Sequence, residues 1–463
     1  MKFYSTKSKE KSYSFSEAIS MGLADDGGLF VPEYFPSKKI ESFSGLNSMA
    51  EVAQELLKDF FKGDDLEKNL ARICQQAFDF EVPLVEVRPL RESVLVKGKA
   101  ATAAVAVNAN ATAAATTTTA VGQSTQRGFQ VLELFHGPTL AFKDVGARFL
   151  ANCISGKKLA VMVATSGDTG GAVAGAFVGK PGIQVYILYP EGKISARQET
   201  QLTCWGDNVK AFAVQGTFDD CQRMVKSVLS KAEAHSNLKM KFISANSINI
   251  GRLLPQMVYY AKSSLEYFRA HAVKCNYIIP SGNLGNAVAA FWACKMGLPI
   301  GKIVLATNAN RPIPDFFQTG RWEPRASVMT LANAMDVGNP SNMERFLDLY
   351  SDRAELQNEI QSGQIQSFSV TDEQIRQTIA EGPSRWNQIW CPHTATAIYC
   401  WEKYIQEPHW VVVSTAHASK FETIVEPLIQ QKIPVPVELQ SLLDRPTKKT
   451  VIRADVDELM RNL

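Results

Sequence analysis

The segment "KLAVMVATSGDTGGAVAGAF" (158–177) joins a short apolar run to a stretch rich in glycine and alanine through a polar loop. The apolar run predicts a buried strand, and the small residues after the loop predict a helix. Further runs of this β-branched, apolar character, separated by stretches with helical spacing, lie at 183–189, 209–214, 275–280, 302–307 and 410–414. Near-continuous apolar strands that alternate with helices are typical of parallel sheets covered on both faces. The sequence therefore predicts an α/β fold, with ligands bound beyond the carboxyl ends of the strands.

The composition of the chain excludes several classes of protein. It has 463 residues, 45% of them apolar and 21% charged, which are ordinary values for a globular enzyme of several domains. Lys and Arg number 49 against 46 Asp and Glu, so we expect neither nucleic acid nor a membrane as a partner. The eight cysteines form no CxxC pair and no zinc spacing, which predicts free thiols and no metal site. With no signal peptide or apolar span visible, the expected location is cytoplasmic.

The first 96 residues are predicted to form a mainly helical N-terminal extension domain. Its first helix is expected to begin at Ser14 and to stop at the paired glycines that start with Gly27. Residues 97–128 are mostly Ala, Thr, Val and Asn, without an aromatic residue or an amphipathic period. Such a composition buries little surface, so this segment is predicted to be a low-complexity linker or disordered loop.

Polar side chains follow the first predicted strand of the opening segment. Thr165, Ser166, Asp168 and Thr169 surround a glycine at the start of the Gly- and Ala-rich helix. Backbone N–H groups at a helix N-terminus favour an anion, and small residues let a ligand approach the backbone. The residues alone leave two interpretations equally open, an anion site and an ordinary N-capped turn.

A second loop of this kind, "SGNLGN" (281–286), follows the strand at 275–280 and precedes another helix rich in small residues. It has the character of an anion nest. The chain contains no P-loop and no GxGxxG motif, so the phosphate of a small ligand is expected here rather than a nucleotide.

Two further loops carry candidate binding groups. Asn246, Ser247 and Arg252 lie within "ANSINIGRLLPQ" (245–256), and an Arg with Ser and Asn suits a phosphate dianion or a carboxylate. The alternative is a capped helix with a solvated arginine. Thr415 follows the last apolar run, where it either caps a helix or offers a neutral hydroxyl to a ring nitrogen.

Lys143 lies in the otherwise apolar stretch "LELFHGPTLAFKDVGARF" (132–149). Because desolvating an ammonium is costly, either its head reaches water or the protein needs an amine that can be neutral. His136, in the same stretch, either stacks on a cofactor or caps the turn. One such lysine together with two anion-binding loops indicates pyridoxal phosphate, whose aldehyde condenses with an unprotonated lysine amine.

Eight motifs occur in an order that resembles the threonine synthases. They are "SFSEAISMGLADDGGLFVP" (14–32), "LELFHGPTLAFKDVGARF" (132–149), "VATSGDTGGAVAGAF" (163–177), "ILYPEGKIS" (187–195), "SANSINIGRLLPQ" (244–256), "PSGNLGN" (280–286), "TLANAMDVGNPSN" (330–342) and "STAHASKF" (414–421). The resemblance is to the longer branch of that family, which has an N-terminal extension domain. It covers nearly the whole chain except 97–128.

The resemblance implies a fold-type II pyridoxal-phosphate enzyme with two parallel-sheet α/β lobes, 129–260 and 261–463, and the cofactor between them. It implies conversion of O-phospho-L-homoserine and water into L-threonine and phosphate. The lysine of "FKD" joins the cofactor in this family, so Lys143 takes that role and then acts as the base. Thr415 resembles the partner of the pyridine nitrogen. Asp168 is expected to face the cofactor, through a contact that the resemblance leaves open.

The remaining roles also follow from the resemblance alone. The implied cradle of the cofactor phosphate is Gly282, Asn283, Leu284, Gly285 and Asn286. The implied binders of the substrate carboxylate are Thr165, Ser166 and Thr169, and those of the substrate phosphate are Asn246, Ser247 and Arg252. The alternatives are a phospho-lyase that gives 2-oxobutyrate and a non-catalytic binding relative. A monomer is expected by analogy with the longer branch, with a dimer as the alternative.

Overall fold

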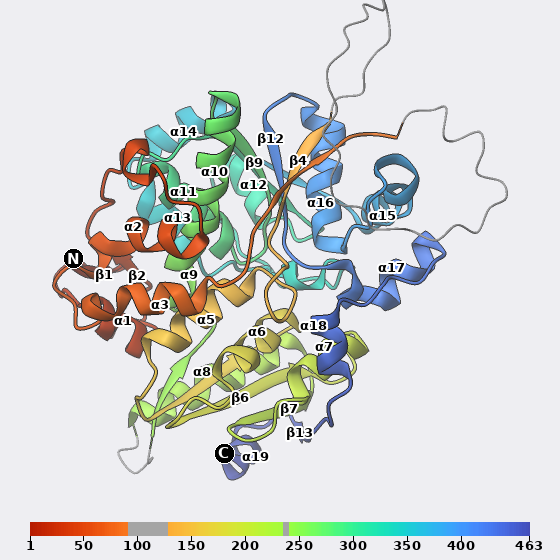
Figure 1. Cartoon of the computed structure of the whole chain (residues 1–463). Helices are drawn as coiled ribbons and strands as arrows, with labels where there is room; N and C mark the ends of the chain where they lie inside the picture. The colour runs from red at the N-terminus through yellow and green to blue at the C-terminus, as the bar shows by residue number, and fades with distance from the viewer. Residues whose placement is uncertain (91–127, 235–239) are drawn as a thin grey trace, which may run out of the picture.

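The computed structural model describes residues 1–90, 128–234 and 240–463 of the chain (Figure 1). The linker predicted over 97–128 lies outside the described residues, apart from Gly128 at its end. Among the described residues, no helix has the length and apolar character needed to cross a bilayer.

Two sheets organise the molecule. The six-stranded sheet has the order β11 (Ile365–Ser369), β10 (Ile300–Thr307), β9 (Cys275–Pro280), β12 (Trp410–Ser414), β4 (Phe129–Glu133) and β3 (Leu84–Val87). Its strands pair in parallel except for β3, which is antiparallel to β4. The five-stranded sheet is parallel throughout, in the order β13 (Thr450–Arg453), β7 (Val209–Gln215), β6 (Ile183–Pro190), β5 (Leu159–Ala164) and β8 (Lys241–Ser244). The predicted α/β fold with parallel sheets is confirmed.

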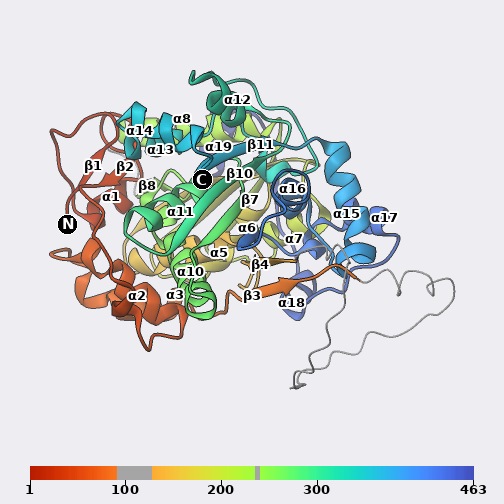
Figure 2. The ribbon, with the colours of Figure 1, turned by 90° about the horizontal axis from the view of Figure 1, so that it is seen from above.

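Helices cover both faces of these sheets. They are α5 (Lys143–Cys153), α6 (Asp168–Phe177), α7 (Ala196–Thr203), α8 (Phe218–Ala234), α9 (Ile250–Leu253), α10 (Met257–His271), α11 (Gly285–Lys295), α12 (Pro312–Thr319), α13 (Met343–Leu349), α14 (Arg353–Gln361), α15 (Asp372–Trp386), α16 (Pro392–Cys400), α17 (Glu422–Ile429), α18 (Val437–Leu443) and α19 (Val456–Asn462). Figure 2 shows α10 and α11 on one side of the six-stranded sheet and α16 on the other. The side chains of β9 alternate between the two faces of the sheet in agreement with this arrangement. Tyr277 and Ile279 belong to the core under α10 and α11, and Ile278 belongs to the core under α16.

Each apolar run predicted from the sequence is a strand. The strands of the two sheets that lie outside those runs are β4 and the four edge strands β3, β8, β11 and β13. In β13 only Ile452 is buried, so the strand has no apolar run. An edge strand pairs on one side only and needs less apolar surface than a central one.

The N-terminal region contains β1 (Phe3–Ser5), α1 (Phe15–Met21), β2 (Phe30–Pro32), α2 (Met49–Phe61) and α3 (Leu70–Ala77). Helix α1 begins as predicted, with Ser14 and Glu17 forming a capping box. It ends at Gly22, which has a φ of 80°, and not at Gly27; the prediction of a longer helix is wrong. The earlier glycine supplies the positive φ that terminates a helix.

The strands do not follow the predicted division into lobes. Strand β4 lies in the six-stranded sheet although it falls within 129–260, and β13 completes the five-stranded sheet although it falls within 261–463. The N-terminal helices share one core with α5, since the rings of Phe15 and Phe61 lie 6.5 and 6.1 Å from that of Phe149. The chain thus crosses between the sheets more than once, which brings distant segments to one place.

Candidate active site

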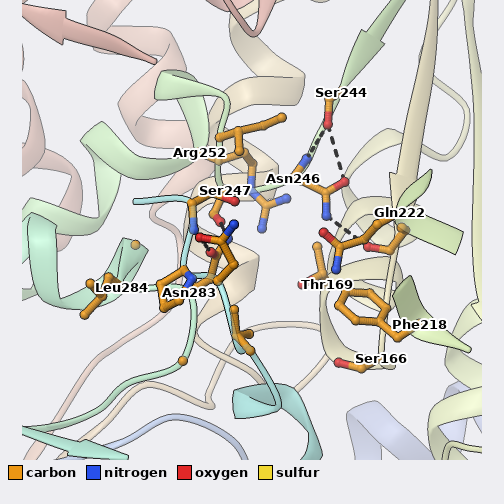
Figure 3. A pocket seen from close by; sticks show the side chains of 18 of the residues that line it. Ser166, Thr169, Phe218, Gln222, Ser244, Asn246, Ser247, Arg252, Asn283 and Leu284 are labelled. Carbon is orange, nitrogen blue, oxygen red and sulfur yellow. Dashed lines mark hydrogen bonds between the residues drawn. The ribbon is translucent and has the colours of Figure 1, made fainter. Parts of the chain in front are cut away.

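A cavity of about 1460 Å³ lies where the carboxyl ends of β5, β8, β9 and β12 meet (Figure 3). Apart from His136, every candidate residue predicted from the sequence lines it: Lys143, Thr165, Ser166, Asp168, Thr169, Asn246, Ser247, Arg252, Gly282, Asn283, Leu284, Gly285, Asn286 and Thr415. These residues come from five separate segments of the chain. The sheet topology brings all of them to one place, as the strand-end rule for parallel sheets predicts.

Lys143 is the first residue of α5. The preceding turn is fixed to the segment after β12 by an antiparallel bridge between Ala141 and Ala416, and Phe142 N donates to Thr415 O at 2.9 Å. Burial lowers the pKa of the Lys143 amine to about 8, with Lys420 and Arg252 acting in the same direction and Asp168 opposing them. About a tenth of such an amine is neutral at pH 7. Lys143 is half-buried and lines the cavity, and its lowered pKa gives it a neutral fraction that a fully solvated lysine lacks.

Asp168 makes a contact that the sequence could not reveal. Its Oδ1 pairs with Lys420 Nζ at 2.9 Å and accepts from Gln198 Nε2 at 3.0 Å. Burial by itself would raise the pKa of Asp168, but the cations Lys420 and Lys143 hold it well below its usual range. Asp168 is therefore an ionised acceptor and carries no proton to donate.

The loop between β5 and α6 closes around Gly167, which has a φ of 124°. A Cβ at Gly167 would lie 2.5 Å from Gln198 Nε2, so both conformation and space require glycine. The hydroxyl oxygen of Thr165 accepts from Gly167 N at 3.0 Å and from Gly170 N at 2.9 Å. Thr165 is thus occupied in shaping the loop, which leaves Ser166 and Thr169 as its more accessible hydroxyls.

The loop from Gly282 to Asn286 has two features of an anion cradle. Leu284 has a φ of 61°, a left-handed conformation that turns the backbone into α11. Asn286 Oδ1 accepts from the hydroxyls of Tyr259 at 2.6 Å and Tyr260 at 2.7 Å. Its Nδ2 is buried without a partner in the described structure, so a donor is available for a ligand.

Arg252 is only 3% exposed, so the alternative of a solvated arginine is wrong. Its guanidinium donates to Ala245 O, while its Nε is buried without a partner in the described part of the chain. Burial lowers the pKa of Arg252 to about 10. Helix α5 approaches it closely, since a Cβ at Gly146 would lie 2.5 Å from Arg252 O. An unpaired buried cation of this kind is suited to an anionic ligand.

The loop that carries Asn246 and Ser247 is tied to the loop from Gly282 to Asn286. Ser247 Oγ accepts from Asn283 Nδ2 at 2.8 Å, as Figure 3 shows, and from Asn342 Nδ2 at 3.3 Å. Asn246 Nδ2 donates to Ala164 O at 2.9 Å, at the carboxyl end of β5. Asn246 thus holds this loop against β5, and Ser247 holds it against the loop from Gly282 to Asn286.

His136 does not line the cavity. Its Nε2 bonds to Glu133 Oε2 at 2.7 Å and its ring stacks on Phe135 with centroids 4.9 Å apart. Of its two predicted roles, these contacts support a local one at the turn.

The sequence missed several residues of this site. His393, at the start of α16, lines the cavity; its Nε2 accepts from Ala334 N at 3.1 Å, and its Nδ1 has no partner in the described structure. Burial lowers the pKa of His393 to about 4, so the ring is neutral. The N-terminal region supplies part of one wall: Met21, Leu23, Ala24, Asp25, Gly27 and Leu29. None of these residues follows a predicted strand, so the strand-end rule does not find them.

Known proteins match this chain over its whole length. Residues 92–420 match the family described as "Pyridoxal-phosphate dependent enzyme", 2–78 match "Threonine synthase N terminus" and 394–462 match "Threonine synthase, C-terminal". Threonine synthase of Serratia marcescens is 33% identical over 470 residues, covering 100% of this chain and 99% of the relative.

Two solved structures of threonine synthases have the same fold. The enzyme from Escherichia coli superposes with a TM-score of 0.82 at 32% identity, covering 100% of this chain and 99% of that one. The PLP-bound enzyme from Brucella melitensis superposes with a TM-score of 0.81 at 30% identity, covering 100% and 98%. This chain belongs to the threonine synthase family of pyridoxal-phosphate-dependent enzymes.

Proposed function

We propose that this protein uses pyridoxal phosphate to convert O-phospho-L-homoserine and water into L-threonine and phosphate. The observation that carries the proposal is that the Lys143 amine, with a pKa lowered to about 8, lies in the same cavity as two candidate anion-binding loops, 245–256 and 281–286. A phosphorylated cofactor and a phosphorylated substrate together require two such loops.

The residues present fit the cofactor. The unpartnered Asn286 Nδ2 and the backbone from Gly282 to Gly285 would hold its phosphate, and Lys143 would join its aldehyde. Thr415 would offer its hydroxyl to the ring nitrogen, since the bond from Phe142 N to Thr415 O keeps the two segments together. When bound, pyridoxal phosphate supplies a ring that accepts electrons from the substrate.

The substrate would be held at both ends. The unpartnered Nε of Arg252 and the side chains of Asn246 and Ser247 would bind its phosphate, and Ser166 and Thr169 its carboxylate. Thr165 would act by shaping the carboxylate loop through its bonds to Gly167 and Gly170.

Lys143 would then remove the proton from the substrate α-carbon. A base works best when its pKa lies near the working pH, and burial brings the Lys143 amine into that range. Arg252 would keep the leaving phosphate in place by its fixed, water-excluded charge.

The test is incubation of the purified protein and pyridoxal phosphate with O-phospho-L-homoserine, with assays for phosphate, threonine and 2-oxobutyrate together. Threonine and phosphate in equal amounts support the proposal. Phosphate with 2-oxobutyrate would identify a phospho-lyase instead, and no release of phosphate would indicate a non-catalytic relative.

The monomeric state, the cytoplasmic location and the lack of nucleic-acid and membrane partners stay predictions. Light scattering during gel filtration tests the first of these, and a mass of twice the chain's 51.0 kDa would identify the dimer.

A further inference from the structure

Lys420 is a fully buried lysine that the roles above do not use. It belongs to the short 3-10 helix Ala418–Phe421 that follows β12, and its side chain is 0% exposed. Its Nζ pairs with Asp168 Oδ1 at 2.9 Å and donates to Thr139 O at 2.6 Å. A buried charge is costly unless it is paired, so this position requires an explanation.

The backbone around Lys420 is fixed from the side of α7. Ser195 Oγ donates to Lys420 O at 2.7 Å, and Arg197 Nη1 donates to Ser419 O at 2.7 Å. The ammonium is therefore directed at Asp168 by contacts outside the cavity, before any ligand binds.

On Asp168 the two contacts fall on the same oxygen. Lys420 and Gln198 both bond to Oδ1, and no donor among the described residues bonds to Oδ2. Asp168 lines the cavity, so the carboxylate has one oxygen held by the protein and one free to accept from a ligand.

The charges around Lys143 act in opposite directions. Asp168 raises the pKa of the Lys143 amine, and Lys420 and Arg252 lower it. Further titratable groups here are His393, which is neutral and lies on α16, and the buried Asp144 on α5, which interacts with Lys420 and Arg252. Lys420 thus counteracts the neighbour that would otherwise keep Lys143 protonated.

We propose that Lys420 is a positioning residue for the reaction: its ammonium fixes Oδ1 of Asp168, keeps Oδ2 ionised and facing the cavity, and offsets the effect of Asp168 on Lys143. The inference rests on the proposed role of Lys143 as the reacting amine. The proposal predicts the direction in which the pKa of Lys143 shifts in each variant, whereas a purely structural role for Lys420 predicts no such shift.

Removing the charge of Lys420 and removing the charge of Asp168 should shift the pKa of the Lys143 amine in opposite directions. Lys420→Met leaves Asp168 unopposed, so the neutral amine becomes rarer at pH 7. Asp168→Asn leaves Lys420 unopposed, so the neutral amine becomes more common. Each change should be on the order of tenfold, the effect of one charge at close range. The double variant should fall between them, close to the parent.

The neutral amine can be measured without turnover. Full-length protein without added cofactor is labelled with trace acetic anhydride from pH 6 to 10, and the acetylation of Lys143 is read by peptide mass spectrometry. The protein loaded with pyridoxal phosphate is titrated in parallel by its visible absorbance, whose midpoint should move in the same directions.

Lys262→Met is the matched control, because Lys262 is a buried lysine paired with Glu266 on α10 and does not line the cavity. It should leave both readouts unchanged. Circular dichroism checks that each variant is folded. If Lys420→Met does not fold, Lys420→Gln is used, since it retains a donor without the charge. It must shift the pKa of the Lys143 amine in the direction expected for Lys420→Met.

Shifts of the same sign in Lys420→Met and Asp168→Asn, or no shift in a folded Lys420 variant, would overturn the proposal. The labelling result stands apart from catalysis, since it needs neither cofactor nor substrate. A protein with the expected signs but no threonine product would refute the proposed function and leave the role of Lys420 intact.

Discussion

The guanidinium of Arg345 joins the N-terminal region to the candidate active site, with Nε donating to Phe30 O on β2 at 2.9 Å. Its Nη1 and Nη2 donate to Ser247 O at 3.1 Å and to Ile248 O at 2.7 Å, in the loop proposed to bind the substrate phosphate. Arg345 is fully buried, and burial lowers its pKa to about 9. Its bonds to backbone carbonyls hold that loop in place.

Arg345→Lys should therefore weaken substrate binding although the residue does not line the cavity. A single ammonium cannot satisfy carbonyls that lie in several directions, and each buried acceptor left unpaired costs about 1–3 kcal/mol. We expect a lower free energy of unfolding and a several-fold higher KM for O-phospho-L-homoserine, with kcat less affected. Urea unfolding and initial rates measure these. Arg453→Lys, at an exposed ion pair with Glu458, is the control and should change neither; an unaltered KM in a folded Arg345 variant would refute this role.

Lys143→Ala should abolish both turnover and the visible absorbance of the bound cofactor. The reason is that the other lysines of the described lining, Lys226 and Lys241, lie on different elements, within α8 and at the start of β8, whereas Lys143 begins α5. Absorbance spectra after gel filtration and a phosphate-release assay provide the measurement. Lys226→Ala is the comparison and should retain the band. Near-normal activity in Lys143→Ala would show that the lysine is wrongly assigned.

Arg252→Ala should raise the KM for the substrate and also lower kcat, because the same charge binds the phosphate and stabilises it as it leaves. A loss on the order of a hundredfold in kcat/KM is expected for an interaction of about 3 kcal/mol. The comparison is Gly146→Ala, whose Cβ would lie 2.5 Å from Arg252 O and 3.0 Å from its Nε, and so displace the residue without removing its charge. Its KM should rise in the same direction by a smaller factor. Unchanged kinetics in Arg252→Ala would remove this residue from the phosphate site.

The stability of the protein should fall as the pH decreases from 6.5 towards 4, partly because of His393. Its pKa is lowered from 6.5 to about 4 by burial, so in this window the unfolded chain binds a proton that the folded chain does not. The contribution is at most about 3 kcal/mol, from 1.36 kcal/mol per pKa unit. It is fully present above pH 6.5 and lost as the pH approaches 4.

The thermal midpoint as a function of pH measures this effect. His393→Gln should flatten the curve between pH 6.5 and 4, since the amide does not titrate. His417, whose pKa burial also lowers to about 4, should still give its own part of the slope in that variant. A curve with the same slope in His393→Gln would contradict the assignment of a buried, neutral ring.

The strand-end loops were predictable because each one is local in the sequence. Gly167, Gly282 and Arg252 belong to continuous motifs in which conformation, small size and charge can be recognised residue by residue. Lys420 and Arg345 were not predictable in this way. Each is an ordinary basic residue in its own segment, and its role comes from partners more than 200 residues away, Asp168 for Lys420 and Phe30 for Arg345.

The sequence by itself determined the parallel α/β fold, the lysine and the loops at the strand ends, because apolar periodicity and turn chemistry are properties of short segments. Only the tertiary structure decided the protonation of these groups. The pKa of Lys143 and the ionised state of Asp168 depend on burial and on Lys420. Lys420 follows β12, and it reaches them because β12 lies between β4 and β9 in one sheet. Desolvation and Coulomb interactions act through space, so they become defined only when distant segments are packed together.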